Sequence, residues 1–477
     1  MQSFKTASWC RNLTVSCIVA ALCAGGSTAQ VTSPHGVSGD PIRIQSPMNN
    51  AFEERTVTPD VDSSWSPVGV GTDREVYSVA QFGHKLIVGG KFSSAGGVAA
   101  SHIAAWDGSS WSPLGTGTND VVYALAVYGG KLVAGGIFFS AGGNDAYYIA
   151  SWDGASWSPL GSYPWGTGPN QDVLALTIYE GKLIAGGWFT TAGGRVVNRI
   201  AAWDGVSWSP LGSGMSREDT SRVSVGALTV YDGRLIAGGM FTTAGGTVAH
   251  GIASWDGTSW SPLGSGVDYY SDPFVGALAV YHGRLYAGGG FDTAGGIPAS
   301  SIASWDGISW SSLESGAGGV TGAMIMSLAV YNDMLIAGGV FSSVGGVPAN
   351  NIASWDGNSW SPLGSGMRGW GHSLTVFEHS LIVGGNFTEA GSQSCNFIAR
   401  WYENCCIGTT GNVDGDTSDA VDVSDLSAMV DYLFGDQALP ETCFQEQDVD
   451  RSGAIDISDL QSIIDFLFNS VALPSCP

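Results

Sequence analysis

One sequence unit occurs seven times along this chain, and this repetition constrains the fold more than any other feature. Each copy contains a Ser-Trp dipeptide, whose tryptophans follow one another at intervals of 46 to 52 residues: Trp65, Trp111, Trp157, Trp208, Trp260, Trp310 and Trp360. An Ile-Ala-x-Trp segment and a Gly-Gly-x-Phe segment recur with it, first at Trp106 and Gly89. A repeat of this length is typical of solenoids and propellers.

Each copy predicts four short strands. In residues 225–264 the apolar segments are VGALTVY, RLIAGGMF, GIASWDG and SWSPLG. Asp-Gly pairs at Asp232 and Asp256 provide tight turns, because both residue types tolerate a positive φ, and the FTTAGG segment predicts a longer link. Four antiparallel strands every 50 residues, with no helical pattern between them, predict an all-β, seven-bladed β-propeller over residues 63–403.

Proline indicates the order of the strands. Six of the seven Ser-Trp segments carry proline two residues after the tryptophan, as in Pro67, and proline cannot donate a hydrogen bond to a central ladder. The Ser-Trp strand is therefore predicted to be outermost and the ALAVY-type strand innermost. The first copy begins at its outer strand and the last ends after its third, so we expect the N-terminal strand to complete the last blade.

Charge separates the chain into two parts. The 18 basic and 42 acidic residues give a net charge of −24, which argues against nucleic acid or an anionic membrane surface as a partner. Residues 411–477 carry 14 acidic residues and one basic residue, Arg451, and so hold −13 of this charge. This asymmetry predicts a separate C-terminal domain over residues 411–477, joined by a Cys-containing linker at 404–410.

The N-terminus predicts export. Lys5 and Arg11 precede an apolar run that ends near Ala24, and small residues then offer a cleavage site, which is the pattern of a signal peptide at residues 1–29. We expect a secreted, extracellular protein, associated with the cell surface or not, whose residues 30–62 form a linker. Cys395, Cys405, Cys406, Cys443 and Cys476 then remain, an odd number, so at least one thiol stays free or pairs outside the chain; we hypothesise that Cys405 and Cys406 form disulfides with Cys443 and Cys476.

The loops that differ most between copies gather aromatic residues. Loops between an outer strand and the next inner strand, and loops between second and third strands, are expected to share one face of a propeller. Aromatic rings near polar groups suit a sugar, so the candidate ligand residues are Tyr147, Tyr148, Tyr163, Trp165, Tyr269, Tyr270 and Trp370. The alternative is that these rings only pack the loops. No catalytic motif is present, which leaves the protein without a predicted catalytic residue.

Two 12-residue segments of the C-terminal part have the spacing of calcium loops. Residues 414–425 and 448–459 place oxygen ligands at loop positions 1, 3, 5, 9 and 12, with a backbone carbonyl at position 7. The predicted ligands of two Ca²⁺ ions are Asp414, Asp416, Ser418, Ala420, Asp422 and Asp425, and Asp448, Asp450, Ser452, Ala454, Asp456 and Asp459. An amphipathic helix is predicted after each loop. Position 6 is Gly453 in the second loop but Asp419 in the first, so the first site is expected to be weaker.

Two family resemblances extend these predictions. The repeats over residues 63–403 resemble kelch-like secreted bacterial propeller repeats, a resemblance that is specific for the fold alone. Residues 411–477 resemble a dockerin domain of type I, because no helix precedes either loop and position 12 is Asp. The resemblance implies a cohesin-like partner that contacts loop positions 10 and 11, which are Val423, Ser424, Ile457 and Ser458. Equally, Val423 and Ile457 could pack the core of the small domain.

These features favour a secreted, non-catalytic module that binds or displays a ligand such as a carbohydrate, and that attaches to an extracellular assembly through calcium-dependent protein contact. One alternative is a carbohydrate-active enzyme of polysaccharide degradation with catalytic residues in the propeller loops. Another is a structural cell-surface protein whose dockerin-like unit meets no cohesin. Whether the protein is an enzyme is left open by the sequence, although the lack of a catalytic motif weighs against it.

Overall fold

A computed structural model describes residues 64–161, 168–218, 222–268, 273–319, 322–402, 421, 423–434, 449 and 457–469. The chain divides into two compact units, Met1–Asp60 and Val61–Pro477. The first unit lies outside the described residues, as do the predicted signal peptide and both predicted linkers. The described residues form the repeats and two helices near the C-terminus.

Seven sheets in the described residues contain four main strands in one shared order, with the first strand of a copy at one edge and the Ser-Trp strand at the other. Their strands are β2 (Val76–Phe82), β3 (Lys85–Gly90), β6 (Ile103–Trp106) and β7 (Trp111–Pro113); β8 (Val122–Tyr128), β9 (Lys131–Gly136), β12 (Ile149–Trp152) and β13 (Trp157–Pro159); β14 (Val173–Tyr179), β15 (Lys182–Gly187), β18 (Ile200–Trp203) and β19 (Trp208–Pro210); β21 (Ser224–Tyr231), β22 (Arg234–Met240), β25 (Ile252–Trp255) and β26 (Trp260–Pro262); β28 (Phe274–Tyr281), β29 (Arg284–Gly290), β32 (Ile302–Trp305) and β33 (Trp310–Ser312); β35 (Met324–Tyr331), β36 (Met334–Val340), β39 (Ile352–Trp355) and β40 (Trp360–Pro362); β41 (Met367–Phe377), β42 (Ser380–Ala390), β44 (Ile398–Trp401) and β1 (Trp65–Pro67). We number these sheets 1 to 7.

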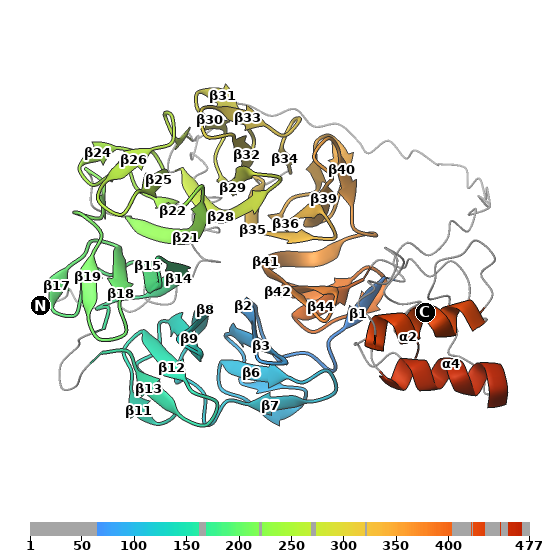
Figure 1. The fold of residues 1–477 in the computed structure, drawn as a ribbon. Helices are drawn as coiled ribbons and strands as arrows, with labels where there is room; N and C mark the ends of the chain where they lie inside the picture. Colours follow the sequence, from blue (N-terminus) through green and yellow to red (C-terminus); the bar gives the residue numbers. More distant parts are fainter. Residues whose placement is uncertain are drawn as a thin grey trace, which may run out of the picture. The chain divides into compact units, whose positions relative to one another are not determined.

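The sheets form a ring. Each first strand contacts the first strand of the next sheet, in the succession β2, β8, β14, β21, β28, β35 and β41, and β41 in turn contacts β2. Figure 1 shows these strands toward the centre of the ring and the Ser-Trp strands at its outside. Sheets arranged radially in this way define a β-propeller. The predicted strand order is confirmed, and proline occupies the outer edge, where no further strand needs its missing N–H group.

Tryptophans join neighbouring sheets. The indole of Trp260, on the outer strand of sheet 4, packs on Trp255 of the same sheet with ring centroids 5.3 Å apart. Its N–H group donates to the carbonyl oxygen of Leu211, at the end of the preceding outer strand, over 2.9 Å. The Ser-Trp tryptophans are all buried, so they are core residues. Each buried indole has a hydrophobic contact inside its sheet, and in most copies a hydrogen bond to the sheet before it.

The link between second and third strands is more ordered than a loop. In sheets 1 to 6 the link forms a short hairpin whose two strands have two residues each. In sheet 7 the second of these short strands pairs with the end of β42. These short strands are β4 (Ser94–Ala95) and β5 (Val98–Ala99), β10 (Ser140–Ala141) and β11 (Asn144–Asp145), β16 (Thr191–Ala192) and β17 (Arg195–Val196), β23 (Thr243–Ala244) and β24 (Thr247–Val248), β30 (Thr293–Ala294) and β31 (Ile297–Pro298), β37 (Ser343–Val344) and β38 (Val347–Pro348), and β43 (Gln393–Ser394). The diglycine at the hairpin turn has positive φ angles, as at Gly245 and Gly246, which explains why glycine recurs there.

The segment after each outer strand pairs with the hairpin of the next copy. In three copies this segment forms a strand of its own, namely β20 (Met215–Ser216), β27 (Val267–Asp268) and β34 (Ala317–Gly318). In the first three copies a single bridge makes the same contact, for example between Thr72 and Ala95. The two variable loop sets are therefore hydrogen-bonded to each other, on one face of the propeller.

The innermost strand of every sheet contains a β-bulge at the same repeat position. The pairing register with the second strand shifts there by one residue in all seven sheets. The bulge residues are Tyr77, Tyr123, Leu174, Gly226, Gly276, Met326 and His372. A bulge changes the direction of a side chain relative to a regular strand, and its residue lies outside the regular pairing.

The first and last parts of the repeat array share sheet 7. Strand β1 pairs antiparallel with β44, with Trp65 opposite Trp401 and Pro67 opposite Ala399. Trp65 is only 1% exposed, and its indole N–H group donates to the carbonyl oxygen of Leu363 over 3.2 Å. The N-terminal strand thus covers the edge of β44 that would otherwise be open.

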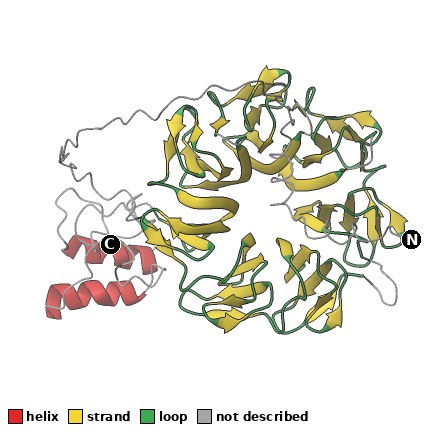
Figure 2. Cartoon of the chain, turned by 180° about the vertical axis from the view of Figure 1, so that it is seen from behind, coloured by secondary structure: helices red, strands yellow, loops and turns green. Residues whose placement is uncertain are grey.

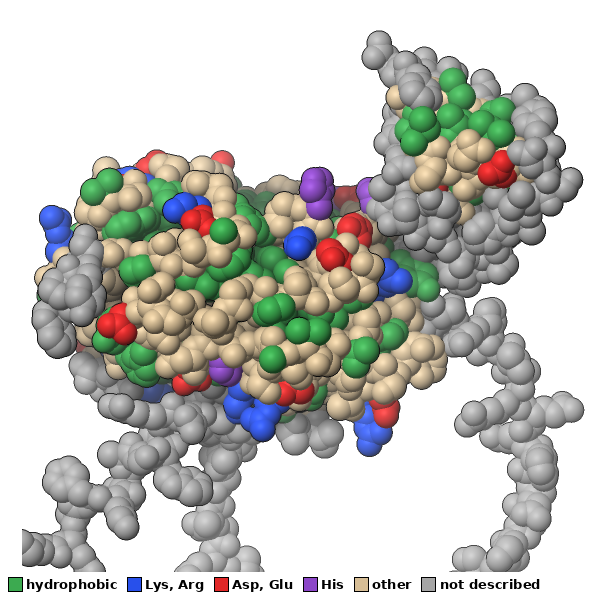
Figure 3. Space-filling model, turned by 90° about the horizontal axis from the view of Figure 1, so that it is seen from below, with side chains coloured by type: hydrophobic (Ala, Val, Ile, Leu, Met, Phe, Trp, Pro, Cys, Tyr) green, Lys and Arg blue, Asp and Glu red, His purple; other side chains and the backbone are tan. Residues whose placement is uncertain are grey.

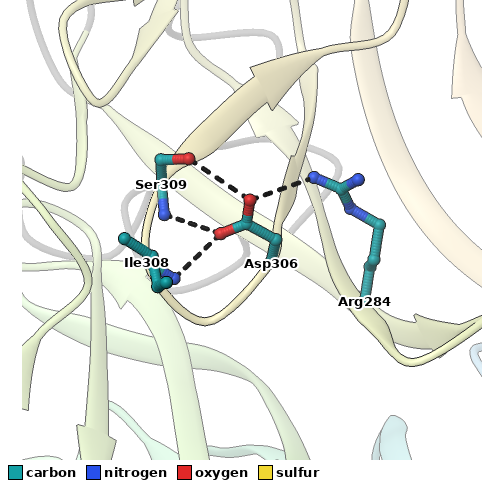
Figure 4. A network of polar contacts seen from close by, with 4 residues as sticks. All are labelled: Arg284, Asp306, Ile308 and Ser309. Atoms are coloured by element: carbon teal, nitrogen blue, oxygen red, sulfur yellow. Dashed lines mark hydrogen bonds and ion pairs between the residues drawn. The ribbon is translucent and has the colours of Figure 1, made fainter.

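An aspartate orders the turn between third and fourth strands in six copies. In sheet 5, Oδ1 of Asp306 accepts hydrogen bonds from the backbone N–H groups of Ile308 and Ser309, at 2.8 and 2.7 Å (Figure 4). Oδ2 accepts from the Ser309 hydroxyl group, and the Arg284 guanidinium lies 3.5 Å away. These hydrogen bonds, the backbone ones first, lower the pKa of the carboxyl group, and the same holds for Asp107, Asp153, Asp204, Asp256 and Asp356.

These turns predict acid sensitivity. A carboxyl group whose pKa is lower in the folded than in the unfolded chain contributes stability above about pH 4, and this contribution is lost as the pH falls below it. Asparagine can accept the same two backbone bonds without titrating. We expect replacement of all six aspartates by asparagine to flatten the decrease of melting temperature between about pH 5 and pH 2. Parallel melting curves for the parent chain and the sixfold variant would contradict this assignment.

Two helices lie near the C-terminus, α2 (Val423–Phe434) and α4 (Ile457–Asn469). Their first residues are 34 positions apart, the same offset as between the two predicted calcium loops. They pack on each other through buried Met429, Leu460 and Ile463. Figure 2 shows helix only in these two segments of the described chain. No helix among the described residues is long and apolar enough to cross a membrane.

Candidate functional site

Three aromatic residues form an exposed cluster on the hairpin face of sheet 2. Phe139 and Tyr147 are 45% and 44% exposed, and their ring centroids lie 6.1 Å apart. Tyr148 is half-buried, with its ring 5.3 Å from that of Phe139 in an edge-on arrangement. We call Phe139, Tyr147 and Tyr148 the aromatic triplet. Its exposed rings are suited to stacking on an apolar ligand face.

The backbone holds the aromatic triplet in place. Tyr148 has a φ of +66°, in the left-handed region that costs a non-glycine residue energy. Its N–H group donates to the Phe138 carbonyl oxygen over 2.8 Å, and its carbonyl oxygen accepts from the Gly136 N–H group over 2.9 Å. The side chain of Tyr148 also packs against the core of sheet 3. The rings are therefore positioned before any ligand binds, which lowers the entropy cost of binding.

Phe139 was missed in the sequence analysis. The corresponding residues of the other copies are Ser93, Thr190, Thr242, Asp292, Ser342 and Thr388. An exposed aromatic ring at a position that is otherwise small and polar is the signal that could have revealed it. The structure brings it together with Tyr147 and Tyr148, because the hairpin of β10 and β11 places its two ends side by side.

The remaining aromatic candidates do not join this cluster in the described residues. Tyr163, Trp165, Tyr269 and Tyr270 lie outside the described residues. Trp370 was expected in a loop, and this expectation is wrong. It lies inside strand β41 and pairs with Asn386, because the seventh copy continues its inner strand back to Met367 through an additional bulge.

Polar groups near the hairpins are partly engaged in their own loops. The Arg199 guanidinium donates to the carbonyl oxygen of Trp188, and burial lowers its pKa. The Asn198 side chain donates to the carbonyl oxygen of Ser213 over 2.8 Å. On the face drawn in Figure 3, charged side chains are sparse and uncharged atoms cover most of the described surface. Such a surface suits an uncharged ligand better than a polyanion.

The two described members of the predicted calcium sites are buried carboxylates. Asp425 and Asp459, at loop position 12, are both 0% exposed and lie in the first turns of α2 and α4. An ionised carboxylate is buried at such a place only when it is hydrogen-bonded or neutralised by a cation. The helix N-terminus also favours negative charge. These residues fit a cation site, since carboxylate oxygen is the donor type that Ca²⁺ prefers.

The other predicted calcium ligands lie outside the described residues, from Asp414 to Asp422 and from Asp448 to Asp456. Within the described part of the chain, no group of three His, Cys, Asp or Glu side chains is arranged to hold a metal ion. The structure therefore places one carboxylate of each predicted site, and the rest of the coordination remains a prediction.

The predicted partner residues lie at the starts of the helices. Ile457 is 65% exposed and so does not pack the small core, which leaves its apolar side chain available for contact. Ser458 is half-buried and its carbonyl oxygen accepts from the Ser462 hydroxyl group over 3.0 Å. Val423 and Ser424 begin α2, and their side chains lie outside the description.

Cys395 is buried in the propeller rather than in the C-terminal segment. It is 1% exposed in the core of sheet 7, and burial raises the pKa of its thiol to about 11. A thiol in such surroundings is unreactive. The other four cysteines of the predicted disulfides, Cys405, Cys406, Cys443 and Cys476, lie outside the described residues.

The fold and its surface define a β-propeller with an exposed aromatic cluster on its hairpin face. Among solved structures, the chain is similar to the extracellular domain of the putative one-component system BT4673 from B. thetaiotaomicron, with 11% identity and a TM-score of 0.47 over 71% of this chain and 40% of that chain. A structure described as the extracellular domain of the putative hybrid two-component system BT4673 gives 13% identity and a TM-score of 0.46, over 71% and 39%. This chain thus spans about 40% of the length of the BT4673 chains.

The WD40 β-propeller domain of Doa1 is also similar, with 14% identity and a TM-score of 0.42 over 71% of this chain and 96% of that chain. No protein-family model and no curated protein matches the sequence. The assignment to β-propellers therefore rests on the strand order and on the ring of contacts between innermost strands.

Proposed function

We propose that this chain is a secreted, non-catalytic binding module. In this proposal its seven sheets are the blades of one closed propeller that binds a saccharide on its hairpin face. The C-terminal segment, over residues 411–477, is a dockerin-like domain that holds two Ca²⁺ ions and attaches the propeller to a cohesin-like protein outside the cell. The aromatic triplet is the observation that carries the binding part of the proposal.

The chemistry of the aromatic triplet favours a neutral sugar. Rings that are nearly half exposed offer flat apolar surface to the C–H groups of a sugar ring. Asn144 and Asp145, both exposed in the same hairpin, offer hydrogen-bonding groups for hydroxyls. The net charge of −24 disfavours sulfated or phosphorylated ligands, which would require a basic surface.

The dockerin-like part of the proposal is supported by three features that agree. The helices start 34 residues apart, as do the loops, and each helix buries the carboxylate at loop position 12. The two helices share one small apolar core. A core of this size stabilises a domain only weakly, so folding coupled to calcium binding is expected.

A double substitution tests the ligand site. Other copies show which residues the hairpin tolerates, so Phe139→Thr with Tyr147→Asn copies sheet 3 and should preserve the fold. We expect the double variant to bind neutral oligosaccharides at least about tenfold more weakly than the parent chain, because two stacking surfaces are lost. Isothermal titration against gluco-, xylo-, manno- and galacto-hexaoses measures this.

The control is Val206→Ala, which changes an 83% exposed apolar residue on a turn between third and fourth strands and should leave binding unchanged. Release of reducing sugar from these oligosaccharides by the parent chain would instead show an enzyme and overturn the non-catalytic proposal. Retention of full affinity by the double variant would place the ligand elsewhere on the protein.

A further inference from the structure

Side chains at the bulges of the innermost strands meet one another around the ring. The ring of Tyr77, in sheet 1, lies 5.3 Å from that of Tyr123 in sheet 2 and 5.1 Å from that of His372 in sheet 7, measured between centroids. Trp370, two residues before the bulge in sheet 7, lies 6.2 Å from His372 in an edge-on arrangement. We call Tyr77, Tyr123, His372 and Trp370 the bulge cluster. It links three neighbouring sheets.

The cluster is confined to one part of the ring. Leu174, at the bulge of sheet 3, and Ile137 of sheet 2 pack against Tyr77 and Tyr123. In sheets 4 and 5 the bulge residues are Gly226 and Gly276. A Cβ atom on Gly276 would lie 2.6 Å from the ring of Phe274, so these glycines make room for that ring. In sheets 7, 1 and 2 the innermost strands therefore carry aromatic side chains with polar groups. In sheets 4 and 5 the ring of Phe274 lies against the bulge glycines instead.

A purely structural role does not account for the bulge cluster. The seven sheets share one strand order and one bulge, so packing makes similar demands on each copy. Nevertheless the bulge residue is Tyr, Tyr, Leu, Gly, Gly, Met and His in successive sheets. Where the bulge residue is glycine, the ring of Phe274 fills the space, so the bulge position itself does not require an aromatic side chain. The variation is better explained by what the side chains contact near the centre of the ring.

The imidazole of His372 carries a buried nitrogen without a hydrogen-bond partner. Nε2 of His372 is buried and makes no hydrogen bond within the described residues. A buried polar group without a partner costs stability unless a ligand or water satisfies it. Burial lowers the pKa of His372 to about 4, so the imidazole is neutral near pH 7 and offers one donor and one acceptor. The group matches an uncharged hydroxyl rather than a carboxylate or phosphate.

We propose that the bulge cluster is a second binding site, in which one sugar ring of a neutral saccharide stacks on Trp370 and bonds to His372 and Tyr77. The class of ligand rests on the function proposed above, whereas the site is separate from the aromatic triplet. Trp370 and His372 keep part of their surface exposed, which a stacking ligand requires. Trp188, half-buried in sheet 3, occupies the repeat position of Ile137 and extends the aromatic character of this region.

Substitutions taken from other copies test the site in the full chain. His372→Leu and Tyr77→Leu introduce the residue of sheet 3, and Trp370→Ser introduces Ser224 of sheet 4. The matched control is Tyr286→Ile, because Tyr286 is a buried tyrosine of the second strand at a position that is Ile87 or Ile184 in other copies. Thermal melting of each variant verifies that the propeller is folded.

The probes are the same four neutral hexaoses, followed by isothermal titration and tryptophan fluorescence. We expect Trp370→Ser and His372→Leu each to weaken binding at least tenfold, and Tyr286→Ile to change it less than twofold. If the parent chain binds and only the Phe139→Thr, Tyr147→Asn variant weakens binding, the bulge site is overturned while the proposed function stands. If the parent chain binds none of the probes, the proposed saccharide function fails and this site fails with it.

Discussion

We expect a chain that lacks residues 60–70 to melt at a markedly lower temperature than the parent chain. These residues include β1, whose loss removes the pairing of Trp65 with Trp401 and exposes the edge of β44. Trp65 is 1% exposed, and removing a buried tryptophan side chain alone costs about 3–5 kcal/mol. The melting temperature should fall by at least about 5 °C, as followed by differential scanning calorimetry.

Two point variants of Trp65 should lower the melting temperature to different extents. Trp65→Phe keeps a ring against Trp401 but loses the hydrogen bond to Leu363, so it should destabilise less than Trp65→Ala. A chain that lacks residues 30–59 but keeps β1 is the matched truncation and should melt like the parent. An unchanged thermal transition after removal of residues 60–70 would show that β1 does not hold the ring closed.

Removal of calcium is expected to unfold the C-terminal segment without affecting the propeller. In a hydrogen-exchange experiment on the full chain, addition of a chelator should accelerate amide exchange in α2 and α4, because their shared core is small. Amides of the seven sheets provide the internal control and should keep their protection. Equal exchange in α2 and α4 with and without chelator would refute the calcium assignment.

Substitution of the carboxylates at position 12 sharpens this test. Titration calorimetry should detect two bound Ca²⁺ ions per parent chain, and Asp425→Asn or Asp459→Asn should weaken one of them by about 10- to 100-fold, the loss of a charge-assisted ligand. Asp465→Asn, an aspartate of α4 outside both loops, should leave both sites unchanged. If all three variants bind calcium like the parent, the buried carboxylates of Asp425 and Asp459 are not ligands.

Local pattern was sufficient to predict much of the fold. Apolar segments separated by turns, two of them with Asp-Gly, predicted four strands per copy. Proline at Pro262 and its equivalents predicted which strand is outermost. Both features depend on backbone geometry within a few residues, which sequence shows directly. The FTTAGG segment was expected to be only a link, but it contains the first strand and the turn of a hairpin. Strands of two residues are too short to show the alternation of apolar and polar residues that indicates a strand in a sequence.

The candidate ligand site was predicted less completely. Tyr147 and Tyr148 were identified, but Phe139 was not, since it lies at the other end of the hairpin and joins them only after folding. The segment that contains Trp370 corresponds to a loop in the other copies, so a loop was expected there. Pairing of Trp370 with Asn386 instead makes the segment part of strand β41. In both cases the pairing of two strands across a hairpin decided the result.

The sequence by itself determined the repeated unit, its four strands and its outer edge, and it indicated the duplicated acidic segment. These properties follow from turn chemistry, from proline and from the spacing of apolar residues. Only the tertiary structure decided that every innermost strand carries a bulge, and that the bulge residues of sheets 7, 1 and 2 touch. A bulge depends on the register between two strands, and contacts between sheets depend on the curvature of the whole ring, so neither is encoded in any single copy.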